Sequence, residues 1–275
     1  MRIDAALIWA TSWLTNSDSA LLDAQVLLAH VVEKETVYLM TWPERELSRT
    51  QKNAFETFIE QRKIGVPVAH LTGTREFWSL PLKVNDSTLI PRPDTEILVE
   101  TALLVCSPQA KVLDLGTGTG AIILALASEL PLASCYAIDF SEQAVQLARE
   151  NAKLLNLNNV TIAQSNWFES VQGEFDVIVA NPPYIDENDL HLKQGDVRFE
   201  PLAALVASQH GLADIRLIIT QARDYLSTNG SLLIEHGFEQ GESVREIFTL
   251  SAYDNIKTIK DYGDNDRITI ATYKR

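Results

Sequence analysis

Apolar runs with strand character alternate with helical stretches along the chain from residue 93 onward. Helical patterns lie near 120–130, 141–155, 211–227 and 239–250, and the runs read KVLDLG, SCYAIDF, VTIAQS, FDVIVAN, GSLLIEHG, NIKTIK and RITIATY. Apolar strands that alternate with helices indicate a parallel sheet covered on both faces. Only a short turn, Asp261 to Asp266, joins the last two runs, so the final strand should pair antiparallel with its predecessor. The pattern predicts an α/β fold with a seven-stranded, mostly parallel sheet.

The N-terminal part of the chain has a different pattern. Residues 3–15, 20–33 and 49–64 are predicted to form helices, with Ser48 placed to cap the third and Gly65 to end it. The run EFWSLPLKVN, which contains Pro81 and ends at Asn85-Asp86, predicts an extended hairpin. We therefore expect a helical N-terminal domain (1–73), a hairpin linker (74–90) and an α/β domain (91–275).

Composition excludes several classes of protein. The formal net charge of −14 argues against stable binding to phosphate backbones, and 46% apolar residues are ample for a buried core. Cys106 and Cys135 form no CxxC motif, and the five histidines lack ligand spacing, so no metal site is predicted. Neither an export signal nor a membrane-spanning segment is found near the start. We expect a cytoplasmic protein without membrane association.

A glycine-rich loop follows the first strand of the predicted sheet. The strand Val112 to Leu115 leads into the residues Gly116, Thr117, Gly118, Thr119 and Gly120, which precede a predicted helix. Ligands of open α/β sheets bind at the carboxyl ends of strands, and glycine lets the backbone approach them closely. The spacing is GxGxG rather than the GxGxxG of dinucleotide sites, which suits a ligand without a pyrophosphate. We predict that these five residues bind a cofactor; the alternative is a turn without a ligand.

Two residues at the ends of the next strands extend this candidate site. Asp139 lies 19 residues after Gly120 and is placed to accept hydrogen bonds from ribose hydroxyls, since Ser141 is the better helix cap. Trp167 follows Ser165-Asn166 at the end of the third strand and offers an apolar wall for an adenine ring. Packing in the core is the equal alternative for Trp167.

The fourth strand ends in the motif Asn181-Pro182-Pro183-Tyr184. Prolines donate no N–H, so nearby carbonyls are free to accept hydrogen bonds from a ligand. The Asn181 side chain and the Pro182 carbonyl together can hold both hydrogens of an NH2 group, and Tyr184 offers a flat face to a planar substrate. Two acceptors would favour the positive charge that develops when a poorly nucleophilic amide nitrogen is methylated. We predict that all four residues are catalytic and that Asn181 also contacts the cofactor.

These motifs, in this order, resemble the N-methyltransferases that act on amino groups of bases and amides. Two further runs look like the bacterial release-factor glutamine N5-methyltransferases: Ile90-Pro91-Arg92-Pro93-Asp94-Thr95-Glu96 and Gly195-Asp196-Val197-Arg198-Phe199-Glu200-Pro201. The resemblance covers essentially the whole chain. It implies a Rossmann-like class I fold, S-adenosyl-L-methionine as cofactor, and the glutamine of the Gly-Gly-Gln loop in peptide chain release factors as substrate.

The resemblance also implies roles for the predicted site residues. The loop Gly116 to Gly120 would cradle the methionine part of the cofactor, Asp139 its ribose and Trp167 its adenine. The separate helical segment before residue 74 leads to the further hypothesis that the N-terminal domain recognises the release factor. Asn166 departs from the family, where Asp is frequent, and Arg92 and Arg198 are assigned by default to structural ion pairs. The alternatives are a ribosomal-protein glutamine methyltransferase, a nucleic-acid amino-N methyltransferase, a nicotinamide-dependent oxidoreductase and a non-catalytic scaffold.

Overall fold

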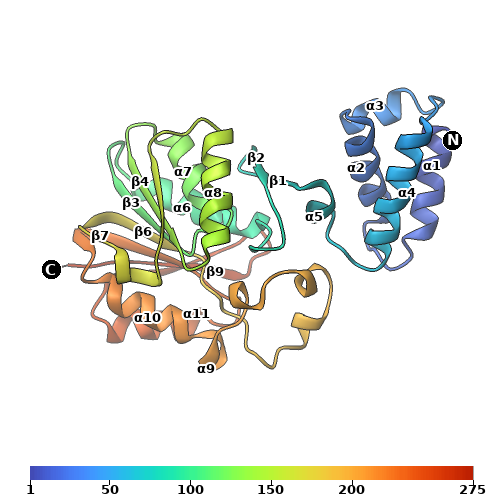
Figure 1. Cartoon of the computed structure of the whole chain (residues 1–275). Coiled ribbons are helices and arrows are strands. Elements are labelled where there is room, and N and C mark those ends of the chain that lie inside the picture. The colour runs from blue at the N-terminus through green and yellow to red at the C-terminus, as the bar shows by residue number, and fades with distance from the viewer. Residues whose placement is uncertain (275) are drawn as a thin grey trace. The chain divides into compact units, whose positions relative to one another are not determined.

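The computed structural model describes residues 1–274, which form two compact units (Figure 1). One unit comprises Met1–Thr74 together with the short segment His191–Phe199. The other comprises Arg75–Leu190 and the residues from Glu200 onward. A segment that follows the Asn-Pro-Pro-Tyr motif along the chain therefore belongs to the N-terminal unit.

The N-terminal unit is helical, as the sequence predicts. Its helices are α1 (Ile3–Trp13), α2 (Ala20–Val32), α3 (Thr36–Thr41), α4 (Arg49–Lys63) and α5 (Val68–Thr72). Ser48 caps α4 in a reciprocal capping box with Gln51, and the helix stops before Gly65, so both end signals are confirmed. The helices α3 and α5 were not predicted, because six and five residues are too few to show a helical period.

Charged side chains hold the segment His191–Phe199 within this unit. The Arg62 guanidinium donates from Nε to Asp23 Oδ2 at 2.7 Å and from Nη1 to Asp196 Oδ1 at 2.9 Å. The Asp23 side chain also accepts hydrogen bonds from the hydroxyls of Ser17 and Ser19. A half-buried arginine shared by two carboxylates therefore joins α2, α4 and the segment.

The second unit contains the predicted seven-stranded sheet, in the order β5-β4-β3-β6-β7-β9-β8. The parallel strands are β3 (Lys111–Leu115), β4 (Ser134–Asp139), β5 (Val160–Gln164), β6 (Phe175–Ala180) and β7 (Leu226–Glu235). The strand β9 (Asp266–Thr272) runs antiparallel to both β7 and β8 (Asp254–Lys260). The predicted fold and its antiparallel C-terminal hairpin are thus confirmed.

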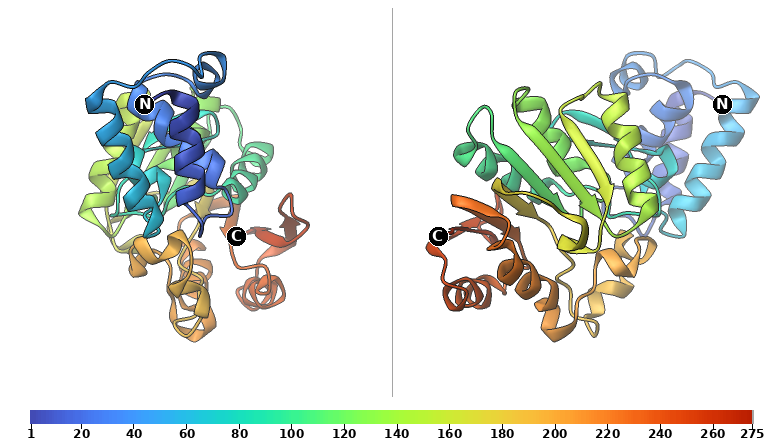
Figure 2. Two further views of the ribbon diagram at one scale, coloured as in Figure 1. Left: turned by 90° about the vertical axis from the view of Figure 1, so that its right-hand side faces the viewer. Right: turned by 60° about the vertical axis from the view of Figure 1, so that its left-hand side comes forward.

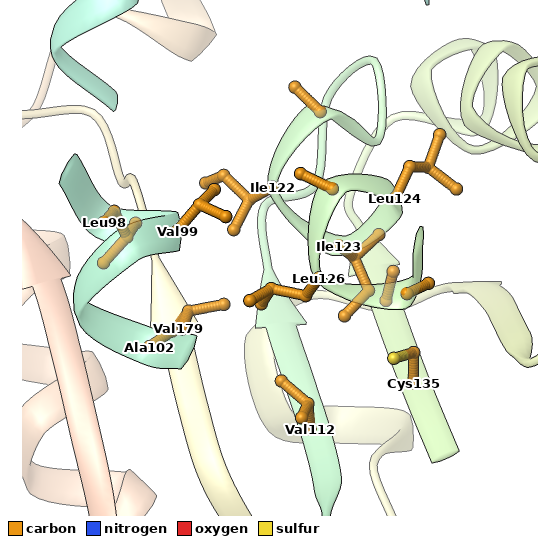
Figure 3. Close-up of a cluster of buried hydrophobic side chains, with 14 of the residues drawn as sticks. Leu98, Val99, Ala102, Val112, Ile122, Ile123, Leu124, Leu126, Cys135 and Val179 are labelled. Atoms are coloured by element: carbon orange, nitrogen blue, oxygen red, sulfur yellow. The ribbon is translucent and has the colours of Figure 1, made fainter. Parts of the chain in front are cut away.

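Helices cover both faces of the sheet (Figure 2). Adjacent strand residues point to opposite faces, and Val112 and Leu113 accordingly belong to two different core clusters. The cluster of Val112 (Figure 3) is formed with α6 (Glu96–Val105), α7 (Ala121–Glu129) and α8 (Glu142–Leu154). The cluster of Leu113 is formed with α10 (Ala213–Ala222) and α11 (Gly241–Leu250). The central strands β3 and β6 are buried on both sides, which explains why they are mostly apolar.

Short elements complete the two units. The hairpin predicted in the linker consists of β1 (Thr74–Phe77) and β2 (Leu80–Lys83). The remaining helices are η1 (Pro93–Thr95), η2 (Trp167–Ser170), η3 (Leu190–Lys193), η4 (Asp196–Phe199), η5 (Leu202–Ala204) and α9 (Ser208–Gly211). Over residues 1–274, no helix has both the length and the apolar character needed to cross a membrane.

Candidate active site

The register of the parallel strands brings the predicted site residues to one edge of the sheet. Leu115 on β3 pairs with Ile138 on β4 and with Ala180 on β6, and Ala180 pairs with Ile234 on β7. The residues that follow these positions are Gly116, Asp139, Asn181 and Glu235. Strands β3, β4, β6 and β7 therefore present the glycine loop, an acid, an amide and a second acid side by side.

The glycine loop has a left-handed backbone at all three glycines, with φ of +72° at Gly116, +54° at Gly118 and +85° at Gly120. The amides of Gly116 and Thr117 both donate to the carbonyl of Ile138 at 2.9 Å, which ties the loop to β4. At Gly120 a Cβ would lie 3.0 Å from Leu124 Cδ1 and 3.3 Å from Ala148 Cβ. Gly120 is therefore required for helix packing, whereas Gly116 and Gly118 face less crowded space.

The two threonines of the loop are buried and hold its shape. The Thr117 hydroxyl donates to Asp114 Oδ2 at 2.7 Å, and the Thr119 carbonyl accepts from Asn151 Nδ2 at 2.9 Å. Burial raises the pKa of the fully enclosed Asp114 carboxyl to about 7. Its Oδ1 atom has no hydrogen-bond partner within residues 1–274. The Thr117 hydroxyl and the Thr119 carbonyl thus support the loop from within the protein.

Asp139 connects the end of β4 to the glycine loop. Its Oδ2 accepts from the Gly118 amide at 2.8 Å, and its Oδ1 accepts from the Ser141 amide at 2.8 Å. Ser141 caps α8 through its hydroxyl, as the sequence predicts, so Asp139 is not the helix cap. Burial raises the pKa of Asp139, partly offset by these amide donors. The carboxylate is fixed beside the loop and retains lone pairs for a further donor.

Trp167 has the core packing of one alternative, and its contact with an adenine stays a prediction. It packs against the core cluster of Leu113, and its ring also lies next to the loop, where a Cβ at Gly116 would be 3.6 Å from Trp167 Cζ3. Its neighbour Asn166 is exposed and donates from Nδ2 to Glu169 Oε1 at 2.7 Å. The indole is therefore placed as a wall beside the loop.

The Asn-Pro-Pro-Tyr turn is held from several sides. Asn181 donates from Nδ2 to Thr95 Oγ1 at 3.3 Å, and the Tyr184 hydroxyl donates to Glu235 Oε1 at 3.3 Å. Gln240 Nε2 donates to the Tyr184 carbonyl at 3.0 Å, and a Cβ at Gly211 would overlap that carbonyl. Burial, together with the Glu235 charge, raises the pKa of the Tyr184 phenol. Tyr184 is therefore a neutral hydrogen-bond donor with a fixed backbone.

The structure also brings in residues that were not among the predicted site residues. Thr95 and Glu235 both touch the turn, and Glu235 is 1% exposed. The position of Glu235 in the sequence could have identified it. An acidic residue directly at the end of an apolar strand is costly to bury unless it is hydrogen-bonded or paired, so it indicates a polar site there. Thr95 had no such signal beyond its place in the run Ile90 to Glu96.

The two sequence runs that carried the resemblance have mainly structural contacts. Arg92, from the first run, forms a buried ion pair with Glu200, from the second. Arg198 donates from Nε to the Gly195 carbonyl at 3.0 Å, and its guanidinium lies 5.3 Å from the centre of the Phe199 ring. Arg92 thus has the ion-pair role assigned to it by default, whereas Arg198 contacts a carbonyl and a ring.

The fold and the edge residues together define a class I methyltransferase. The family model described as "Methyltransferase domain" matches residues 107–265. In agreement, a solved methyltransferase from Pyrococcus furiosus has a similar fold, with a TM-score of 0.56, 20% sequence identity, and coverage of 71% of this chain and 90% of that chain. That likeness concerns the fold alone.

Closer relatives define the family. The model described as "PrmC N-terminal domain" matches residues 5–73. The chain is 54% identical over 274 residues to the release factor glutamine methyltransferase of Shewanella oneidensis, covering 98% of this chain and 96% of that protein. It is 52% identical over 266 residues to that of Escherichia coli, covering 96% of each. The chain belongs to the family of release factor glutamine methyltransferases.

Proposed function

We propose that this protein transfers a methyl group from S-adenosyl-L-methionine to the side-chain amide nitrogen, N5, of the glutamine in the Gly-Gly-Gln motif of peptide chain release factors. The observation that carries the proposal is the pairing of Leu115 with Ala180. This pairing sets the glycine loop and the Asn-Pro-Pro-Tyr turn next to each other, as transfer between two ligands requires. The names of the relatives reported above support a release factor as the substrate, and we propose that the protein acts in the cytoplasm.

The residues at the sheet edge fit this cofactor. Gly116 and Gly118 have positive φ and leave room that a Cβ would narrow, as close approach of a ligand to the backbone requires. The Asp139 carboxylate beside them suits ribose hydroxyls, and Trp167 suits an adenine face. The buried Asp114 carboxyl, one oxygen of which lacks a hydrogen-bond partner within residues 1–274, would add negative potential near the loop when ionised. The cofactor, when bound, supplies a methyl group on a positively charged sulfur.

The Asn-Pro-Pro-Tyr turn would supply hydrogen-bond acceptors that help a substrate amide to accept a methyl group. An amide nitrogen is a weak nucleophile because its lone pair is delocalised, and positive charge builds on it as the new bond to carbon forms. Asn181 Oδ1 and the Pro182 carbonyl are the acceptors that would hold its two hydrogens and stabilise that charge. Tyr184 would pack against the planar amide. One nitrogen-bound proton leaves to solvent after methylation, so acceptors suffice and no strong base is needed.

We further propose that the N-terminal domain recognises the release factor. Helix α3 of this unit exposes Val37 and Met40 by 60% and 64%, and nearby Trp42 by 44%. Exposed apolar side chains grouped on one short segment suit contact with a protein. The double variant Val37→Ser/Met40→Ser should raise KM for the release factor and leave cofactor affinity unchanged. An unchanged KM would remove α3 from the proposed surface.

Mass spectrometry of a release factor incubated with the enzyme and S-adenosyl-L-methionine tests the main proposal. We expect one added methyl group, mapped to the Gly-Gly-Gln glutamine, and none on a release factor in which that glutamine is replaced by asparagine. Cofactor binding without methylation of any release factor would contradict the proposed substrate. Ribosomal proteins and then nucleic acids would be the next acceptors to test.

A further inference from the structure

The segment that connects β7 to α11 holds Tyr184 at two points. Glu235, the last residue of β7, accepts a hydrogen bond from the Tyr184 hydroxyl at 3.3 Å. Gln240, the residue before α11, donates from Nε2 to the Tyr184 carbonyl at 3.0 Å. The side chain and the main chain of the last residue in the Asn-Pro-Pro-Tyr turn are therefore both bonded to one short segment.

Backbone groups use the acceptor and both donors of the Gln240 side-chain amide. Its Oε1 accepts from the Gly237 amide at 2.8 Å, and its Nε2 donates to the carbonyls of Tyr184 and His210, both at 3.0 Å. The Gly237 N–H can only donate, so it fixes the position of Oε1 and directs the NH2 hydrogens toward the two carbonyls. With the amide turned by 180°, its oxygen would face both carbonyls. Gln240 therefore joins three loops in one orientation only.

The His210 carbonyl belongs to a segment with an unusual backbone. Gln209, His210 and Gly211 are all left-handed, with φ of +56°, +58° and +79°. This conformation is unfavourable for residues other than glycine, and strained residues of this kind concentrate at functional sites. A Cβ on Gly211 would overlap the Tyr184 carbonyl and lie 2.7 Å from Gln240 Nε2. The strained segment thus lies directly against the carbonyl that Gln240 holds.

The residue after Tyr184 is bonded to the chain just before this strained segment. Ile185 forms a parallel bridge with Val206. The Ile185 amide donates to the Leu205 carbonyl at 2.9 Å, and the Ile185 carbonyl accepts from the Ala207 amide at 3.1 Å. The end of the turn is therefore fixed by hydrogen bonds on both sides of the Tyr184 carbonyl.

The two prolines make the turn dependent on what holds its ends. Pro182 and Pro183 have no backbone N–H, so neither can be fixed by donating a hydrogen bond. The position of the Pro182 carbonyl consequently depends on the residues at either end of the turn. Asn181 is set by β6, which ends directly before it, and Tyr184 is set by the contacts described above.

We propose that Gln240 is a positioning residue, which fixes the Tyr184 carbonyl and thereby places the Pro182 carbonyl and the Tyr184 ring for methyl transfer. This inference rests on the proposed function, because that function assigns both groups to the substrate amide. Misplacement of a reacting group by about 1 Å can cost about 100-fold in rate, so acceptors for an amide nitrogen must be held in place. Gln240 acts through the turn and not on the substrate itself.

The test compares Gln240→Met and Gln240→Glu with Asn159→Leu. Methionine has nearly the shape of glutamine but forms none of its three hydrogen bonds, whereas glutamate keeps an acceptor for Gly237 and loses both donors. Asn159 is the matched control, because its partly buried amide also donates to two backbone carbonyls, those of Ala127 and Leu130, at 3.2 and 3.1 Å. It precedes β5 and therefore lies at the opposite end of the parallel strands from the turn.

We expect both Gln240 variants to lower kcat by about tenfold or more, the effect of roughly one lost hydrogen bond on a transition state. The dissociation constant for S-adenosyl-L-methionine should stay within about twofold, which also shows that the variants are folded. The KM for the release factor should stay within about threefold, since Gln240 does not hold the substrate. Asn159→Leu should keep the wild-type kcat, although it loses two hydrogen bonds of the same kind.

Hydrogen exchange followed by mass spectrometry gives a second readout that does not depend on turnover. Peptides that contain the amides of Ile185 and Ala207 should exchange several-fold faster in Gln240→Met than in the wild type, and at the wild-type rate in Asn159→Leu. Unchanged exchange or a wild-type kcat in Gln240→Met overturns the inference, as does an equal loss of kcat in Asn159→Leu. Absence of methylation by the wild type would instead refute the proposed function, so the two failures are distinguishable.

Discussion

Arg92 and Glu200 lie 108 positions apart and form one ion pair, with Arg92 Nη2 at 2.8 Å from Oε1 and 2.7 Å from Oε2 of Glu200. The Glu200 side chain is fully buried, and its Oε1 also accepts from the Ile90 amide at 3.2 Å. The arginine side chain is 33% exposed. The segment before α6 and the segment after the active-site loop are thus joined by a buried charge.

This pair should matter for stability. Arg92→Ala removes a guanidinium that donates to both oxygens of the buried Glu200 carboxylate, so we expect a loss of roughly 2–3 kcal/mol of unfolding free energy. Lys83→Ala is the control, because its bridge to Glu150 is about half exposed on both sides and should contribute less than about 1 kcal/mol. Urea denaturation at pH 7.5 measures both. Equal losses in the two variants would show that burial does not strengthen the Arg92 pair.

Asn181 should be needed for turnover but not for cofactor binding. Asn181→Ala removes the acceptor proposed for the substrate amide, so kcat should fall on the order of 100-fold or more. The dissociation constant for S-adenosyl-L-methionine, measured by calorimetry, should change less than about threefold, since the glycine loop and Asp139 are intact. Asn158→Ala, in the turn before β5, is the control and should change neither kcat nor the dissociation constant for the cofactor. Full turnover in Asn181→Ala would contradict the amide grip.

The cofactor loop should depend on the small size of Gly116 as well as on its backbone. Gly116→Ala and Gly173→Ala both place a Cβ on a left-handed residue, with φ of +72° and +87°. Each should cost about 1 kcal/mol of stability. A Cβ at Gly173 meets nothing within 4 Å, whereas one at Gly116 projects beside Trp167. We therefore expect only Gly116→Ala to weaken cofactor binding, by about tenfold or more. Equal cofactor affinities in both variants would argue against binding at this loop.

Asp114 should make stability depend on pH in a defined direction. Its folded pKa is about 7, raised by burial from an ordinary value of 3.8. Between these values the folded state binds a proton that the unfolded state has lost, so stability falls as pH rises. The contribution of the bound Asp114 proton to the free energy of unfolding is complete below about pH 4 and is lost above about pH 7. Asp114→Asn retains an acceptor for the Thr117 hydroxyl but cannot titrate.

The measurement is the unfolding free energy of both proteins at pH 5 and pH 7.5. We expect the wild type to lose more stability than Asp114→Asn over this interval, and the difference between the two isolates Asp114 from the other carboxyls. The same loss in both proteins would mean that Asp114 is already ionised at pH 5. Added S-adenosyl-L-methionine should reduce the difference, since a positive charge near Asp114 lowers its pKa.

Several features could be predicted from local sequence because their physical causes are local. The succession of an apolar strand, a glycine-rich loop and a helix is encoded by neighbouring residues. The helix caps at Ser48 and Ser141 are encoded in the same way. The short turn between β8 and β9 likewise dictates an antiparallel hairpin. The chemical types at Gly116, Asp139 and Asn181 pointed to the same sheet edge, since carboxyl ends of parallel strands meet there.

Other features depended on contacts between residues far apart in sequence. Strand β9 lies between β7 and β8, and the segment His191–Phe199 belongs to the N-terminal unit; neither follows from a local pattern. The partners of Arg92 and Asn181, which are Glu200 and Thr95, are 108 and 86 positions away. The residue types alone predicted that an amide and a glycine loop would lie at the edge of the sheet where ligands bind. Only the tertiary structure decided which buried hydroxyl contacts that amide, because a hydrogen bond depends on positions in space that many chain segments set together.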